Sequence, residues 1–166
     1  MRRREAESAA GVIGAASEVW EYPDGHLQVT LELRHRIIHQ IRTFRPDLVL
    51  THRPNDYHPD HRAVGQVAVD AVFPTARDPL NFREHLDQRL QPWKVAELFL
   101  WSTNEANQIV DIGDWIDRKI DALAHHASQF HDFGETAKWL RRRAEELGER
   151  TGYRAAEGFR RVMLAR

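Results

Sequence analysis

Apolar and polar positions along the chain predict helices and strands in turn. Residues 2–16 are rich in Ala, Arg and Glu, which favours a helix. Apolar residues recur at helical spacing in three further segments, residues 27–44, 62–73 and 115–126. A further helix is expected from the basic stretch around residues 138–143, continuing as an amphipathic segment to Leu164. Short apolar runs predict strands at residues 19–20, 48–51, 95–101 and 108–112. Because helices and strands alternate, we expect an α/β fold with a mostly parallel sheet flanked by helices.

The chain opens on a charged helix, whereas a doubly wound domain normally opens on a strand that becomes central in its sheet. We therefore expect residues 1–166 to form a single, partial domain whose sheet is missing its first strand. The uncovered sheet edge would favour self-association and low stability, so a homo-oligomer is expected. Prolines 74, 79 and 92 bracket a polar stretch that is predicted to be an irregular insertion.

Composition narrows the classes of function. The net charge of −1, from 24 basic and 25 acidic residues, provides no field for gathering nucleic acid or coating an anionic membrane, so a small-molecule or protein partner is expected. No apolar run approaches the roughly 20 residues of a membrane span, and no signal peptide is visible, which predicts a cytoplasmic protein. Because cysteine is absent, His, Asp or Glu must bind any transition metal.

The loop from Thr51 to His61 concentrates the candidate chemistry, with three histidines and two aspartates. It follows the apolar run Leu48-Val49-Leu50, interpreted as a buried strand, and ligands bind at the carboxyl ends of such strands. His58 and His61 lie where the following helix begins, and imidazole is the commonest metal ligand. The competing interpretation is a polar loop whose histidines cap the helix or lie in solvent.

Two neighbouring residue types have ordinary structural explanations. Asp56 and Asp60 suit an N-cap, and at least one of them is expected to cap the helix. No residue lies at a sequence spacing from His52 that would indicate a functional pair, so His52 is expected to be structural.

The runs Arg45 to His52 and Asp56 to Gly65 resemble the PIG-L, or LmbE-like, family of zinc-dependent N-deacetylases. Other segments are similar to that family in the same order: residues 2–7 with Gly14, the turn at 23–25, and residues 101–103, 119–129 and 156–159. The resemblance implies a Rossmann-like fold in which zinc activates water. The reaction would remove an acetyl group from an N-acetylglucosamine-type amide in a small amino-sugar conjugate.

The resemblance also implies roles for individual residues. His61 matches a zinc ligand, and His58 matches the histidine that stabilises the tetrahedral intermediate or protonates the leaving amine. Asp60 matches the carboxylate that orients it. A second group of residues is expected to bind substrate: Arg2, His126 and Gln129.

The family's first motif, Ala-His-Pro-Asp-Asp-Glu, has no counterpart in this sequence. In the family it supplies a zinc-binding His, a zinc-binding Asp and the general base. A hydrolytic zinc ordinarily takes three protein ligands, so His61 alone cannot hold it. We therefore expect a truncated deacetylase that is inactive by itself. Two alternatives remain open, a non-catalytic module that binds a sugar or a partner, and a subunit whose site another chain completes.

Overall fold

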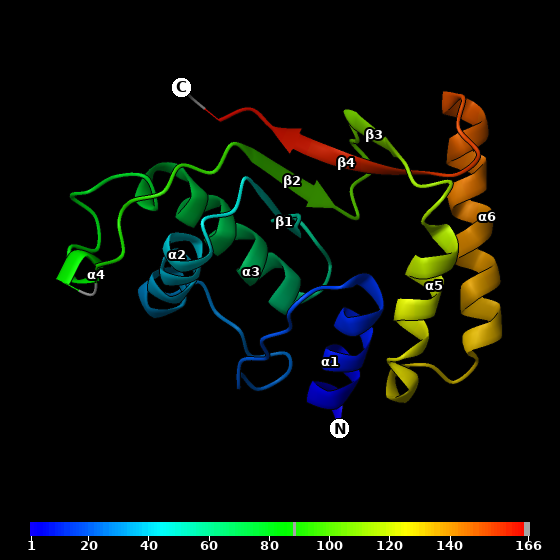
Figure 1. Cartoon of the computed structure of the whole chain (residues 1–166), viewed down its shortest axis with the longest axis horizontal. Coiled ribbons are helices and arrows are strands. Elements are labelled where there is room, and N and C mark those ends of the chain that lie inside the picture. The colour runs from blue at the N-terminus through cyan, green and yellow to red at the C-terminus, as the bar shows by residue number, and fades with distance from the viewer. Residues whose placement is uncertain (88, 165–166) are drawn as a thin grey trace. The chain divides into compact units, whose positions relative to one another are not determined.

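The computed structural model describes residues 1–87 and 89–164. It divides into two compact units, Met1–Glu21 with Ile109–Gly158, and Tyr22–Gln108 with Phe159–Arg166 (Figure 1). The expectation of one partial domain stays a prediction. In the described part of the chain, no helix has both the length and the apolar character needed to cross a membrane.

The sheet has four strands in the order β1-β2-β4-β3. Strand β1 (Leu48–His52) runs parallel to β2 (Glu97–Trp101), with His52 opposite Trp101. Strand β4 (Ala156–Val162) runs antiparallel to β2, and β3 (Gln108–Asp111) follows it in the order. The α/β class is confirmed. The sheet is mixed, however, where a mostly parallel one was expected, because the last strand returns along β2.

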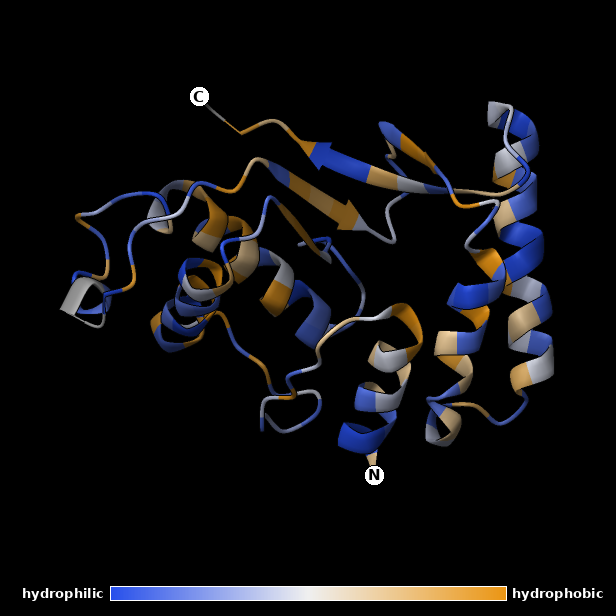
Figure 2. Cartoon of the chain, viewed as in Figure 1, coloured by the Kyte–Doolittle hydropathy of each residue, from blue (hydrophilic) through white to orange (hydrophobic). Residues whose placement is uncertain are grey.

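In the second unit, helices α2 (Leu31–Phe44) and α3 (Pro59–Asp70) enclose the larger core, and β2 is visibly apolar in Figure 2. A short π-helical turn, Ala71–Thr75, continues from α3. The fully or almost fully buried members of this core are Ile38, Ile41, Ala71, Val72, Ala76, Val95, Leu98 and Leu100. The apolar positions at helical spacing in the helix predicted over residues 62–73 are largely buried, as expected.

In the first unit, helices α5 (Ile116–Ala124) and α6 (Phe133–Thr151) contribute to a smaller core of Ile116, Ala144 and Ala155, and helix α1 (Arg2–Ile13) packs against α5. Polar contacts add to this packing. Glu5 accepts hydrogen bonds from the main chain and hydroxyl of Ser128, at 2.9 and 2.6 Å. Ser8 lies 2.7 Å from Nδ1 of His125. The short turn Ala127–Gln129 after α5 is thereby tied to α1.

Three sequence predictions about strands were wrong. Residues 19–20 form no strand in the structure. The segment expected to be helical up to Leu164 contains β4, because Gly152, at φ 82°, ends α6 in a left-handed turn. Strand β1 is not buried: Leu48 and Leu50 are 45% and 52% exposed, since β1 lies at an edge of the described sheet.

Helix boundaries also moved for local reasons. Helix α2 begins at Leu31, later than expected, because the Thr30 hydroxyl accepts the main-chain hydrogen bond of Leu33. Helix α3 begins at Pro59, earlier than the predicted start at residue 62. Proline suits this first position because its ring fixes a helical φ and it lacks an N–H that would be unpaired.

The stretch predicted to be irregular is organised around a buried arginine. Arg42 is 1% exposed, and its guanidinium donates hydrogen bonds to the main-chain oxygens of Thr75, Ala76, Asp78, Asn81 and Phe82. The segment also contains the one-turn helix α4 (Glu84–Asp87). A side chain of α2 thus orders a loop that has little regular structure of its own.

Arg42→Lys should reduce the free energy of unfolding by about 3 kcal/mol or more. One ammonium group cannot replace the hydrogen bonds that Nε, Nη1 and Nη2 of the guanidinium donate to five main-chain oxygens. Arg36→Lys on the same helix is the matched control and should change stability by less than about 1 kcal/mol. Denaturant unfolding measures both. Equal midpoints for the two variants would contradict the organising role of Arg42.

Gly65 lies where α3 crosses β1 at close range. A Cβ at this position would lie 2.5 Å from the main-chain oxygen of His52 and 3.1 Å from the main chain of Arg53. No flexible side chain can yield at this contact, so only glycine fits without a shift of the backbone.

Gly65→Ala should therefore cost about 1 to 3 kcal/mol of unfolding free energy. Gly11→Ala is the control, because a Cβ there meets nothing within 4 Å and alanine favours the helix by up to about 1 kcal/mol. Thermal melts should move in opposite directions for the two variants. A Gly65→Ala protein that melts at or above the parent temperature would disprove the close approach.

Candidate active site

The candidate site lies in the loop between β1 and α3, at the carboxyl end of the strand. The described structure brings His52, Asp56, His58 and His61 of this loop together. Strand β1 fixes the first of these residues, and the first turn of α3 fixes the last. The short connection between them is held by its own hydrogen bonds.

Asp56 is the centre of those hydrogen bonds and is only 3% exposed. Its Oδ1 accepts the main-chain N–H of His58 at 3.0 Å and lies 3.2 Å from Nδ1 of His61. Its Oδ2 lies 3.4 Å from Nε of Arg53. The His58 N–H first, and then His61 and Arg53, lower the pKa of Asp56 against the opposing effect of burial. The group is therefore a carboxylate at neutral pH.

His61 is oriented by this carboxylate. An ionised carboxylate only accepts hydrogen bonds, so Nδ1 of His61 carries the hydrogen. The lone pair of the neutral ring then lies on Nε2, on the far side from Asp56. A carboxylate behind a histidine in this way is the usual support of a metal-binding imidazole.

His58 has the opposite arrangement. It is the N-cap of α3, and its Nδ1 accepts the main-chain N–H of Asp60 at 3.2 Å. Its neutral ring therefore carries the hydrogen on Nε2 and presents a donor. The rings of His58 and His61 are stacked with centroids 4.4 Å apart. The loop thus holds a donor and a lone pair side by side.

The expectation that Asp56 or Asp60 caps α3 was wrong, because the ring of His58 fills that position. Asp56 instead binds the N–H two residues later, a local turn typical of aspartate. The carboxylate of Asp60 accepts the N–H groups of Gly25 and Leu27, at 2.7 and 3.0 Å. The hydrogen bond that holds the His58 ring comes from the main chain of Asp60, so the orienting role expected of its carboxylate stays a prediction.

His52, which was set aside as structural, lies in the same column of rings. Its ring stacks on His61 with centroids 3.8 Å apart and an interplanar angle of 22°. Burial lowers the pKa of His52 to about 4, with a further contribution from His61, so the ring is neutral at pH 7. Its Nδ1 is buried and has no hydrogen-bond partner among the described residues.

The ring geometry tests whether these residues could hold one metal ion. Donor atoms of His52, Asp56 and His61 all lie within 4.8 Å of one another. A ligating imidazole places the ion in its own ring plane, and nearly parallel stacked planes cannot both contain one ion. Asp56, in turn, is engaged by His58 and His61. The loop therefore fits one position of a three-ligand hydrolytic site, at Nε2 of His61.

Two aromatic side chains flank the column of histidines. Tyr57 is 83% exposed, and its ring centroid lies 6.4 Å from those of both His58 and His61. Trp101 is 41% exposed and lies 4.6 Å from the ring of His52. Partly exposed aromatic faces of this kind can stack on the C–H face of a sugar.

The residues expected to bind substrate lie in the first unit. Arg2 is in the first turn of α1, and His126 and Gln129 belong to the turn after α5. The Gln129 amide donates to the Ser128 hydroxyl at 2.9 Å, and Ser128 is held by Glu5. These three residues therefore share one unit, while His58, Asp60 and His61 share the other. Their part in one pocket stays a prediction.

Sequence reasoning underestimated Asp56 and His52. A usable signal existed for Asp56, because an aspartate two residues before a helix N-cap commonly accepts that residue's N–H. The place of His52 beside His61 depends on the close crossing of α3 over β1, for which Gly65 was the clue.

Comparison with known proteins shows which family the chain resembles. The family of GlcNAc-PI de-N-acetylases, PIG-L, matches residues 1–72, which include the whole histidine loop. The chain is 33% identical, over 96% of its length, to a diacetylchitobiose deacetylase of Thermococcus kodakarensis, of which it spans 62%.

Solved structures agree with this resemblance. The N,N'-diacetylchitobiose deacetylase from Pyrococcus horikoshii matches 97% of the chain with a TM-score of 0.87 and 33% identity, and the chain covers 62% of that structure. A conserved protein from Thermus thermophilus matches 99% of the chain with a TM-score of 0.81 and 25% identity, and the chain covers 75% of it. The chain thus spans less than two thirds of the two deacetylases.

One neighbour limits what the fold alone can say. GalB, the 4-carboxy-2-hydroxymuconate hydratase of Pseudomonas putida, matches 99% of the chain with a TM-score of 0.80 at 21% identity, and the chain covers 72% of it. A hydratase and deacetylases therefore share this architecture. The reaction has to be argued from the side chains of the loop.

Asp60 gives the loop a measurable dependence on pH. Burial acts to raise the pKa of Asp60, but the N–H groups of Gly25 and Leu27, with the nearby His58, lower it below its usual value. Because the folded-state pKa is the lower one, this carboxylate stabilises the fold above its unfolded pKa. That contribution is lost as the pH falls through the lowered folded-state pKa.

We expect Asp60→Asn to lower the unfolding midpoint at pH 7 and to flatten its decline between about pH 5 and pH 3. Asp121→Asn, an exposed position on α5, is the control and should follow the parent protein. Denaturant midpoints at several pH values provide the comparison. Parallel curves for the parent and Asp60→Asn would show that the turn does not depend on this carboxylate.

Proposed function

We propose that this protein takes part in the metal-dependent removal of an acetyl group from an N-acetylglucosamine-type amide, and that zinc is the metal. The observation that carries the proposal is that the two histidines of the loop present opposite hydrogen-bonding groups. His61 offers a lone pair on Nε2 with Asp56 behind it, and His58 offers a hydrogen on Nε2 beside it. The similarity to two diacetylchitobiose deacetylases supports the choice of substrate class.

In this proposal His61 is one of the metal ligands, and Asp56 holds its ring in place. The metal, when bound, lowers the pKa of a water molecule and polarises the amide carbonyl. His58 donates its Nε2 hydrogen to the amide oxygen as negative charge develops there, or to the departing nitrogen. Tyr57 and Trp101 are exposed beside these rings and could bind the sugar face. The product would be a free amine and acetate.

In the histidine loop, the described residues supply one of the three ligands that a hydrolytic zinc ordinarily takes, at Nε2 of His61. We infer that catalysis needs ligands beyond this set and that the 166-residue chain by itself is inactive. A family segment with the motif Ala-His-Pro-Asp-Asp-Glu would supply them, either within the same protein or from another chain. A module that binds amino sugars without hydrolysis is the second candidate, and the incomplete ligand set favours it.

The test measures zinc content and acetate release from N,N'-diacetylchitobiose. It compares the 166-residue chain with a version extended by a family segment that carries the first motif. We expect near-stoichiometric zinc and acetate release in the extended version only. Within that version, His58→Gln should keep the metal but reduce turnover by about a hundredfold or more.

His61→Ala should lose metal and turnover together, and His131→Gln, an exposed histidine of the first unit, is the control for both variants. Full turnover in His58→Gln or in His61→Ala would refute the assigned roles. Sugar binding that survives EDTA, without acetate release in either chain length, would refute the hydrolase and support the binding module.

A further inference from the structure

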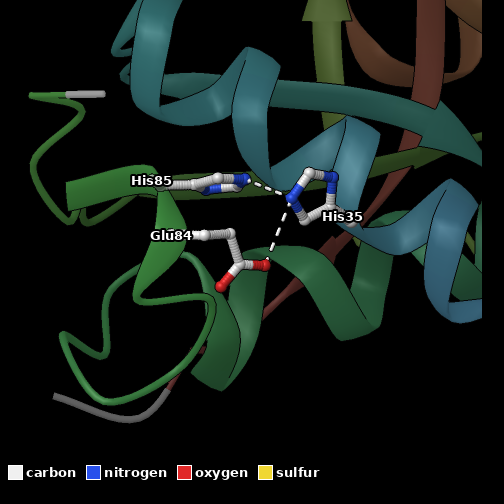
Figure 3. Close-up of side chains that lie close together, drawn as sticks. All are labelled: His35, Glu84 and His85. Carbon is white, nitrogen blue, oxygen red and sulfur yellow. Dashed lines mark hydrogen bonds and ion pairs between the residues drawn. The ribbon is translucent and has the colours of Figure 1, made fainter. Parts of the chain in front are cut away.

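A second group of metal-type ligands lies in the described structure away from the candidate loop. It consists of His35 on α2 and the neighbours Glu84 and His85 on α4 (Figure 3). His35 and His85 are 50 residues apart in the sequence, and both belong to the second unit. None of the three takes part in the proposed deacetylation. A metal site here is therefore independent of that proposal.

The donor atoms of this group point towards one another. The Nε2 atoms of His35 and His85 are 2.9 Å apart, and Nε2 of His35 is 3.3 Å from Oε1 of Glu84. The two rings are inclined at 56°, so their planes cross. An ion bound by both rings has to lie in both ring planes. The inclined rings of His35 and His85 allow this, whereas the stacked rings of His52 and His61 do not. Figure 3 shows the carboxylate of Glu84 facing the same nitrogen of His35.

The distances match those between ligands of one ion. Zinc binds nitrogen and oxygen at about 2.0 to 2.1 Å, so neighbouring ligands at angles between 90° and tetrahedral lie about 2.9 to 3.4 Å apart. Both measured separations fall in this range. His35 and Glu84 keep 38% and 56% of their side chains exposed, which leaves room for water to complete the coordination.

Hydrogen bonds within the group leave one of the three facing atoms without a partner. Arg42 is always a donor, and its Nη1 lies 3.2 Å from Nδ1 of His85, so the neutral ring of His85 carries its hydrogen on Nε2. That hydrogen can bond to Nε2 of His35. The carboxylate of Glu84 then faces the same nitrogen without a hydrogen between them. A cation would accept a lone pair from each of the three atoms.

We propose that His35, Glu84 and His85 form a binding site for a divalent transition metal such as Zn²⁺. Two imidazoles and one carboxylate are ligands that zinc takes in proteins. For Nε2 of His85 to bind the ion, its hydrogen would move to Nδ1. Arg42 would then withdraw the Nη1 hydrogen that faces Nδ1 and keep the hydrogen bond from Nη1 to the main-chain oxygen of Phe82, at 3.0 Å. The ion would clamp α4, and with it the segment wrapped around Arg42, onto α2.

The helix α2 contributes one further histidine at the edge of this site. His39 lies one turn after His35, and its ring meets that of His85 edge-on with centroids 5.5 Å apart. It is therefore a neighbour of the site and not one of the three converging donors.

The proposal is tested by zinc titration of the metal-free chain in which His61→Ala and His58→Gln remove histidines of the two other groups that could hold a metal ion. Calorimetry measures the stoichiometry and affinity, and Co²⁺ absorption reports on nitrogen ligands. We expect one equivalent of zinc to bind, and His35→Gln and Glu84→Gln to weaken binding by more than about tenfold each. Both substitutions are at partly exposed positions, so the fold should survive them.

Glu32→Gln, an exposed change of the same kind on α2, is the matched control and should bind zinc like the parent. A second readout is protease sensitivity of residues 76–94, which zinc should decrease in the parent and leave unchanged in His35→Gln. Zinc binding that is absent, or equally weak in all four proteins, would overturn the proposal. The three side chains would then form a hydrogen-bonded pair of histidines with Glu84 turned to solvent.

Discussion

The buried carboxylate of Asp56 is the interaction on which the candidate site depends. It accepts the N–H of His58 and fixes Nδ1 of His61, so the order of the two histidines along the chain becomes a fixed arrangement in space. Removal of such a buried acceptor leaves donors unpaired, at a cost of about 1 to 3 kcal/mol for each group. The ionic character of Asp56 also determines which nitrogen of His61 carries the hydrogen. One carboxylate thus provides both stability and the direction of a lone pair.

The two histidines of the His-x-x-His element acquire different chemistry from their hydrogen-bond partners. His58 accepts a main-chain N–H and presents a donor, whereas His61 donates to a carboxylate and presents a lone pair. Identical side chains, with rings 4.4 Å apart, are thereby suited to different tasks. The fold does not decide which reaction uses them, since a hydratase and deacetylases share it.

Proximity of histidines and carboxylates is a weak criterion for a metal site, and the relative orientation of the rings is a stronger one. His52 and His61 lie closer together than His35 and His85 by ring centroid, yet their near-parallel planes cannot share an ion. The inclined pair also has its Nε2 atoms at the separation of neighbouring ligands. Arg42 contacts His85 and so connects this pair of histidines to the loop that Arg42 orders.

The sequence by itself determined the alternation of helices and strands, the histidine loop after β1 and the resemblance to the PIG-L family, because these follow from local periodicity and adjacent residues. It misjudged β4, whose strand character comes from pairing with β2, and the burial of β1, which depends on what covers a sheet edge. Only the tertiary structure placed His52 against His61 and brought His35 to His85. His35 and His85 are 50 residues apart, and the place of His52 depends on how α3 crosses β1. No short sequence pattern records how these elements pack.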